Sequence, residues 1–226
     1  MASPLRAVVF DVNETLSDLS PLRARLTEVG APGSLLPTWF AGVLRDGFAL
    51  TASGGFADFS ELAADGLRAL LHAEPGWSGD VEEAAAHVLD GFGSLPVHPD
   101  VPEGVRALRA SGLRLVTMTN GSVSVARGLL ERAGVLDCFE DLLDVHGPGV
   151  WKPAAAAYRW PLERLGLHPG ETLLTAVHPW DVDGARRAGL HGAWLRRGAP
   201  GYPSAMTPPS LTAEDLTDLA RMLAQS

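Results

Sequence analysis

The chain has 226 residues, of which 46% are hydrophobic and 20% charged, and its formal net charge is −9. This length can bury a full hydrophobic core, which excludes a disulfide-stapled miniprotein and a disordered tail. The acidic balance argues against a protein that binds nucleic acid by neutralising phosphates. No apolar run reaches the roughly 18 residues that a membrane span needs, so we expect neither nucleic acid nor membrane as a partner.

The first residues and the cysteine content indicate the cellular compartment. Residues 1–6 lead into a strand-like run and lack the charged-then-apolar layout of a signal peptide. The single cysteine, Cys138, excludes an internal disulfide and fits a reducing cytoplasm, so we expect a cytoplasmic protein. Lys152 is the only lysine among 18 basic residues. A coding bias explains the arginines but not the one lysine that is kept.

In chain order, the first expected element is a buried strand over residues 5–10, because this run is apolar and β-branched. No convincing strand follows until residue 98. Instead, the pattern predicts helices separated by breaks that contain Gly or Pro, over residues 23–29, 36–50, 59–71 and 81–92. Residues 18–97 therefore form a second, all-helical domain inserted after the first strand.

Strands and helices alternate in the rest of the chain. Strands are expected over residues 113–118, 172–177 and 192–195, and apolar stripes at helical spacing lie between them. A Pro/Gly-rich loop over residues 199–209 precedes a final helix over residues 213–223. This alternation predicts an α/β core, residues 1–17 and 98–226, with a parallel sheet covered by helices on both faces.

Polar residues lie at four places, three of them directly after expected strands and one just before the third core helix. The segments are residues 11–16, 119–122, 152–153 and 178–181. In open parallel sheets, ligands bind beyond the carboxyl ends of the strands. We therefore expect all four segments on one rim, as one site.

At and around these segments the sequence reads FDVNETL, TMTNGS, WKP and WDVDGA, and in this order and spacing these stretches resemble the four motifs of the haloacid dehalogenase superfamily. The chain looks most like the type II (S)-2-haloacid dehalogenases over essentially its whole length. The resemblance implies a Rossmann-like core, a helical cap inserted after the first strand, and catalysis through a covalent aspartyl intermediate.

Asp11 is then the expected nucleophile, since a carboxylate can divide a difficult displacement into two steps; taken alone, it could equally cap a helix. Asn13 helps to distinguish phosphate ester hydrolysis from dehalogenation, and it is a candidate substrate contact. The superfamily's phosphatases carry at this position an aspartate that protonates the leaving alkoxide. An amide cannot act as that acid, whereas a halide leaves without a proton.

The fourth motif points away from a metal. The superfamily's phosphatases have a magnesium-binding aspartate five residues before the position of Asp181, and here that residue is Ala176. Magnesium needs oxygen ligands, and Asp11 with Asp181 alone would form a poor site. We expect no required metal and no other cofactor.

By resemblance, Asp181 pairs with Lys152 and helps to activate the water that hydrolyses the ester; it could also cap a helix that starts at Val182. Lys152 would hold Asp11 and the substrate carboxylate, as a compact ammonium that arginine does not replace. Asp183 is expected on the first helical turn, facing solvent.

Thr119 and Asn120 are candidates for binding an anionic oxygen of the substrate, although Asn-Gly is also a common turn. Tyr158 falls where the type II enzymes carry a tyrosine near the site, and it also belongs to an apolar stripe. Trp180, Leu44 and Phe59 match positions that line the substrate pocket in the family. They could equally be ordinary core residues. The cap would close over the rim and exclude water.

Two positions depart from the family. Phe40 stands where the family's halide-binding arginine is expected, and Arg45 lies about 140° away around the same helix. His178 replaces the usual asparagine. It could make activity sensitive to pH, act as a second base, or reshape the pocket.

The leading hypothesis is a metal-independent hydrolase that converts a short (S)-2-haloacid, a small anionic substrate, to the 2-hydroxy acid through an aspartyl ester. The alternatives are a phosphatase or other hydrolase of this superfamily, and a non-catalytic binding protein with a repurposed pocket. Because dimers are common in the family, a homodimer is also a possible assembly.

Overall fold

The computed structural model describes residues 4–225. The chain divides into two compact units. The core unit contains the residues up to Ser17 and those from Pro96 onward, and the cap unit is Asp18–Leu95. Each unit has its own secondary structure and hydrophobic interior, and each is described separately below.

The core unit is built on a parallel sheet with the strand order β3-β2-β1-β4-β5-β6. The strands are β1 (Ala7–Phe10), β2 (Arg114–Thr119), β3 (Asp141–Asp144), β4 (Thr172–Ala176), β5 (His191–Leu195) and β6 (Leu211–Ala213). β1 lies between β2 and β4, and Phe10 is level with Thr117 and Thr175. The segments that follow these three strands therefore leave the sheet at the same edge.

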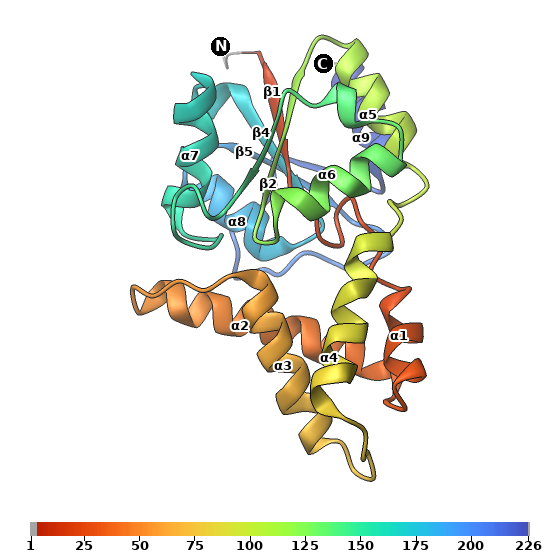
Figure 1. The fold of residues 1–226 in the computed structure, drawn as a ribbon. Coiled ribbons are helices and arrows are strands. Elements are labelled where there is room, and N and C mark those ends of the chain that lie inside the picture. Colours follow the sequence, from red (N-terminus) through yellow and green to blue (C-terminus); the bar gives the residue numbers. More distant parts are fainter. Residues whose placement is uncertain (1–3, 226) are drawn as a thin grey trace. The chain divides into compact units, whose positions relative to one another are not determined.

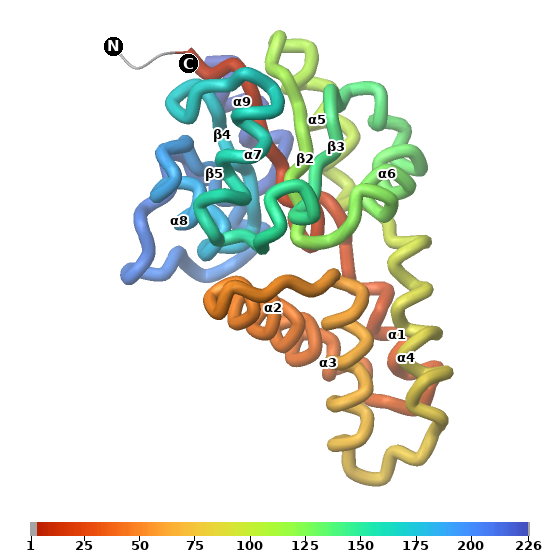
Figure 2. Tube along the Cα trace, turned by 60° about the vertical axis from the view of Figure 1, so that its left-hand side comes forward, coloured from red at the N-terminus to blue at the C-terminus, as the bar shows by residue number. Residues whose placement is uncertain are grey.

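Helices cover both faces of this sheet (Figures 1 and 2). They are α5 (Val101–Ala110), α6 (Val123–Arg132), α7 (Ala155–Leu165), α8 (Pro179–Arg187) and α9 (Leu216–Ala224). α5 packs against α9, and α7 packs against α8 on the opposite face. All four residues of β1 are buried, as expected for a parallel strand covered on both sides. The predicted α/β core is confirmed.

All the regular secondary structure of the cap unit is helical, as predicted. Its helices are α1 (Leu22–Glu28), α2 (Leu36–Ala52), α3 (Phe59–Ala73) and α4 (Val81–Asp90). Acidic caps fix two of the helix starts: Asp58 and Glu61 form a capping box at α3, and the Asp80 side chain accepts two backbone N–H bonds at α4. α3 packs against both α2 and α4.

Three details of the core differ from the sequence expectation. β3 and β6 were not predicted. The last helix begins at Leu216 and not at residue 213, because Leu211–Ala213 pairs with β5 and the Asp215 side chain then accepts the N–H of Asp218 at 2.8 Å. Among the described helices, none combines the length and apolar character needed to cross a membrane.

Candidate active site

The centre of the site is an ammonium held between two carboxylates. Lys152 Nζ lies 2.9 Å from Asp11 Oδ1 and 2.6 Å from Asp181 Oδ2. Asp11 follows β1, Lys152 precedes α7, and Asp181 lies in the first turn of α8. The Lys152 and Asp181 side chains have no exposed surface, and Asp11 is buried. Residues 141 positions apart in the sequence are thus in direct contact.

This arrangement sets the charge of each group. Burial would raise the pKa of Asp11, but the charges of Lys152 and His178 outweigh it, so the pKa of Asp11 lies below its ordinary value. Burial, reinforced by Asp11, raises the pKa of Asp181 despite the Lys152 charge. Burial disfavours the Lys152 ammonium, yet the two carboxylates raise its pKa overall. Asp11 is therefore a carboxylate and Lys152 an ammonium near neutral pH.

Neither aspartate is the helix cap that the sequence also allowed. The segment after Asp11 contains no described helix until α1, which begins at Leu22. α8 begins at Pro179 with His178 as its N-cap residue, so Asp181 lies inside the first turn. Asp183 lies on the same helix, largely covered, where its carboxylate accepts bonds from Arg187 and from the N–H of Thr207.

Asn120 has a positioning function that its sequence context did not suggest. Its Oδ1 accepts the backbone N–H of Lys152 at 2.9 Å, and its Nδ2 donates to the Lys152 carbonyl at 3.2 Å. The segment after β2 therefore fixes the lysine backbone, and the amide that was predicted to bind substrate is largely occupied. Thr119 Oγ1 accepts the N–H of Gly121 at 2.9 Å, which leaves its own proton for another acceptor.

Tyr158, on α7, binds the Asp181 carboxylate at the oxygen that Lys152 does not contact. Its buried hydroxyl donates to Asp181 Oδ1 at 2.7 Å. Burial and the charge of Asp181 raise the pKa of Tyr158 well above its ordinary value, so it stays a donor. Gly184 on α8 makes this approach possible, since a Cβ there would lie 2.5 Å from Tyr158 Oη.

Thr15 is a site residue to which the sequence analysis gave no function. Its Oγ1 donates to Asp11 Oδ2 at 2.7 Å and accepts the backbone N–H of Val177 at 3.1 Å. Both Asp11 oxygens thus have a donor, Lys152 on Oδ1 and Thr15 on Oδ2. The sequence signal that could have identified Thr15 is its hydroxyl four residues after the expected nucleophile.

His178 and Trp180 lie beside the nucleophile. Their rings stack with centroids 5.1 Å apart, and Lys152 Nζ is 6.0 Å from the Trp180 ring centroid. His178 Nε2 lies 3.9 Å from Asp11 Oδ2. Asn13 is also buried here, and its amide lies close to the Thr119–Gly121 turn.

The residues of this site do not fit a magnesium ion. Ala176, at the end of β4, offers no oxygen ligand, and the Lys152 ammonium already lies between the carboxylates that a cation would bridge. Among residues 4–225, no group of three His, Cys, Asp or Glu side chains is arranged to hold a metal ion.

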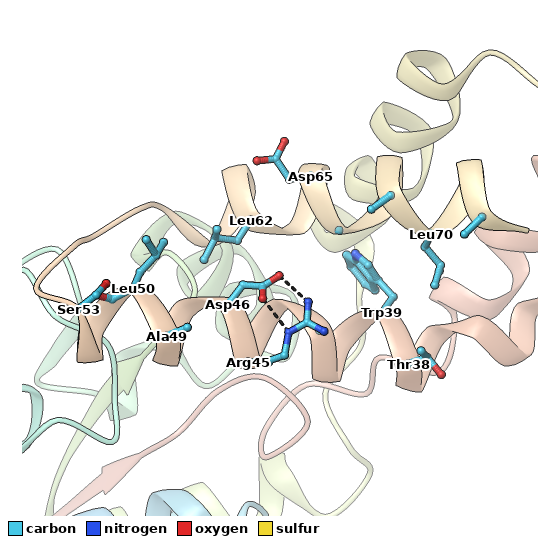
Figure 3. Close-up of a pocket in the computed structure, with 14 residues that line it drawn as sticks. Thr38, Trp39, Arg45, Asp46, Ala49, Leu50, Ser53, Leu62, Asp65 and Leu70 are labelled. Carbon is cyan, nitrogen blue, oxygen red and sulfur yellow. Dashed lines mark hydrogen bonds and ion pairs between the residues drawn. The ribbon is translucent and has the colours of Figure 1, made fainter.

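Phe40 and Phe59, two of the cap residues named in the sequence analysis, belong to an aromatic cluster within the cap unit. The ring centroids of Phe40 and Phe59 lie 6.3 Å apart, and those of Phe59 and Phe92 lie 5.6 Å apart. Phe40 is buried and Leu44 is half-buried. Arg45 points elsewhere: it lines a groove of about 730 Å³ between α2 and α3, where Asp46 binds its guanidinium (Figure 3).

Known proteins share this fold and sequence pattern. (S)-2-haloacid dehalogenase 1 of Pseudomonas sp. (strain CBS-3) is 25% identical over 224 residues, 97% of each chain. The (S)-2-haloacid dehalogenase of Xanthobacter autotrophicus is 28% identical over 196 residues, 85% of this chain and 76% of the relative. A solved structure of the L-2-haloacid dehalogenase from that organism, with chloropropionic acid covalently bound, superposes with a TM-score of 0.85 at 23% identity and covers 97% of this chain and 98% of that one.

A sequence model of the haloacid dehalogenase-like hydrolases matches residues 5–189. This range begins before β1 and ends after α8, so it includes all four motif segments. The chain therefore belongs to the haloacid dehalogenase-like hydrolase family.

Proposed function

We propose that the chain hydrolyses the carbon–halogen bond of a short (S)-2-haloacid through a covalent ester on Asp11. The observation that carries this proposal is the Lys152 ammonium between Asp11 and Asp181, at 2.9 and 2.6 Å. It keeps Asp11 anionic, and it provides positive charge for a substrate carboxylate.

In the first step, a carboxylate oxygen of Asp11 attacks C2 of the substrate with inversion, and the carbon–halogen bond breaks as halide leaves. No proton is needed, which is consistent with an amide at Asn13. Lys152 and Thr15 hold the attacking carboxylate in place. The Thr119 hydroxyl is a further donor for the substrate carboxylate.

In the second step, water attacks Cγ of the Asp11 ester and the 2-hydroxy acid is released. Asp181 accepts the water proton, since it is the carboxylate that remains paired with Lys152 once Asp11 is esterified. The relatives named (S)-2-haloacid dehalogenases, and the chloropropionic acid bound covalently in one solved relative, support this course.

The test is halide release from (S)-2-chloropropionate in the presence of EDTA, with Asp11→Asn as the matched control. We expect release by the wild-type chain, a mass adduct on Asp11, and neither with Asp11→Asn. Release no faster than this control would reject the substrate class. Magnesium-dependent hydrolysis of p-nitrophenyl phosphate would instead favour a phosphatase. A wild-type Asp11 that gains no mass with any of a panel of haloacids would favour a binding protein.

A further inference from the structure

Three oxygen atoms surround one nitrogen of His178. Nε2 lies 3.2 Å from the Asn13 carbonyl, 3.6 Å from Glu14 Oε2 and 3.9 Å from Asp11 Oδ2. A nitrogen lone pair directed at three oxygen lone pairs would be repelled. The surroundings therefore place a proton on Nε2, which donates to the Asn13 carbonyl and lies 3.9 Å from Asp11 Oδ2.

The imidazole ring is held in this orientation. Its side chain is only 13% exposed, it stacks on Trp180 with an angle of 18° between the rings, and its backbone precedes the first residue of α8. Ring stacking fixes the plane, and the Asn13 carbonyl fixes the direction of Nε2. In this orientation Nε2 lies 3.9 Å from Asp11 Oδ2.

Glu14 occupies a backbone conformation that favours glycine, with φ +63°. Its N–H donates to Ser17 Oγ at 3.3 Å, and its carbonyl accepts a bond from His98 Nε2 at 2.9 Å. These bonds hold the residue in the left-handed region with its carboxylate toward His178. Burial and the charge of Asp11 raise the pKa of Glu14, while the charge of His178 lowers it.

The two half-reactions differ in their leaving group. Halide leaves without a proton, but the aspartyl ester must expel an alkoxide, which is a strong base. Asn13 cannot protonate it. We propose that His178 protonates this alkoxide in the second step and that Glu14 positions His178 and balances its charge; this inference rests on the proposed dehalogenation.

The proposed step balances. Water forms a bond to Cγ of the Asp11 ester and gives its proton to Asp181. The bond between Cγ and the substrate oxygen breaks, its electron pair stays on that oxygen, and the oxygen takes the Nε2 proton of the His178 imidazolium. The regenerated Asp11 carboxylic acid returns its proton to His178, and Asp181 releases its proton to solvent.

The charges around the site explain why Glu14 is needed. His178 is faced by Asp11 and Glu14 from the segment after β1, and Asp11 is paired in turn with Lys152, which also contacts Asp181. Once Asp11 is an ester, its charge is gone, and Glu14 is the carboxylate that remains beside the imidazole.

The experiment follows the Asp11 adduct by intact mass after rapid mixing with (S)-2-chloropropionate. His178→Gln keeps an N–H donor of similar reach but cannot transfer a proton. We expect the adduct to form at near the wild-type rate and to decay about 10²-fold more slowly, the scale of general acid catalysis. Glu14→Gln should slow decay about tenfold, since it keeps the side-chain length without the charge.

Leaving-group dependence separates acid catalysis from a structural effect. The ester from dichloroacetate expels a less basic alkoxide than the ester from chloroacetate, so His178→Gln should slow its decay much less. The matched control is His87→Gln in the cap, where His87 Nε2 pairs with Glu28 Oε2 at 2.7 Å; both steps should keep their wild-type rates.

The outcomes are distinct. Equal slowing of both esters by His178→Gln, or normal decay in both site variants, would overturn the inference and leave the dehalogenation intact. Failure of the wild-type chain to form any adduct would overturn the dehalogenation, and the inference with it.

Discussion

Lys152 provides an ammonium to a site in which two carboxylates need one. Because its Nζ contacts both Asp11 and Asp181 without exposed surface, its removal takes the ammonium away from two buried carboxylates and leaves them only neutral hydroxyl donors at Thr15 and Tyr158. We expect Lys152→Met to abolish the Asp11 adduct and to lower the free energy of unfolding by about 3–5 kcal/mol, the scale for breaking a buried ion pair. Denaturant unfolding and intact mass measure the two effects.

Lys152→Arg tests shape separately from charge. The guanidinium is planar and larger than an ammonium, so it cannot contact both carboxylates from the same fully buried position. We expect a folded chain with at least a hundredfold slower adduct formation, on the order of the loss from a misplaced catalytic group. A wild-type rate in this variant would show that positive charge alone suffices.

Tyr158 favours the ionised form of Asp181. Its hydroxyl bond at 2.7 Å favours the Asp181 carboxylate, against the burial that raises the pKa of this residue. Tyr158→Phe removes that bond, so the pKa of Asp181 should rise further. The acidic limb of the pH profile for ester hydrolysis should therefore move to higher pH, which adduct decay at a series of pH values would measure. An unmoved limb would argue against Asp181 as the base.

At the residue scale, the sequence located Asp11, Lys152 and Asp181 because motif order and strand ends determine which residues reach the rim. It did not predict the direction of each side chain. Asn120 was expected to contact substrate but holds the Lys152 backbone, and Thr15 and Glu14 received no role. These contacts depend on a loop path that spacing along the chain does not specify.

At the element scale, the loop after β5 is tied to the segment that carries the nucleophile. Arg197 donates to the carbonyl of Thr15 at 2.9 Å and binds both Asp100 oxygens at 2.8 and 3.0 Å. Asp100 also accepts the N–H of Leu216 at the start of α9. One ion pair thus links the catalytic loop, the start of α5 and the start of α9.

Asp100→Asn should lower the free energy of unfolding at pH 7 by about 2 kcal/mol, the scale of hydrogen bonds to a charged group. Burial opposes the Asp100 charge, but Arg197 and the Leu216 N–H lower its pKa below the ordinary value. The contribution is therefore full above the unfolded-state pKa and is lost as pH falls through the lower folded-state pKa. Unfolding curves of both chains should converge in acid; a constant difference would contradict the ionic role.

Four of the strands were predictable from apolar runs, and two were not. β3 reads Asp-Leu-Leu-Asp and β6 reads Leu-Thr-Ala, which are too short and too polar to stand out. Both pair with neighbours that were already predicted, β2 and β5. Their pairing partners, and not their own composition, make them strands.

At the scale of the whole molecule, the cap unit leaves and re-enters the core at adjacent points. Ser17 and Val97 form an antiparallel bridge, and the N–H of His98 donates to the Leu16 carbonyl at 2.9 Å. A two-residue Asn-Gly turn is well suited to join such a pair. We expect a chain in which Asn-Gly replaces residues 18–96 to fold with a cooperative thermal transition. A broad, non-cooperative loss of near-ultraviolet circular dichroism would mean that the core depends on the cap.

The left-handed backbone of Glu14, at φ +63°, has a consequence for protein engineering. Glycine adopts this conformation without strain, so Glu14→Gly should raise the free energy of unfolding by about 1 kcal/mol. The same change removes the carboxylate that faces His178. A library screened only for heat resistance would therefore enrich glycine at position 14, and the screen would not detect the slower turnover of these variants. Such a screen needs a turnover assay beside it.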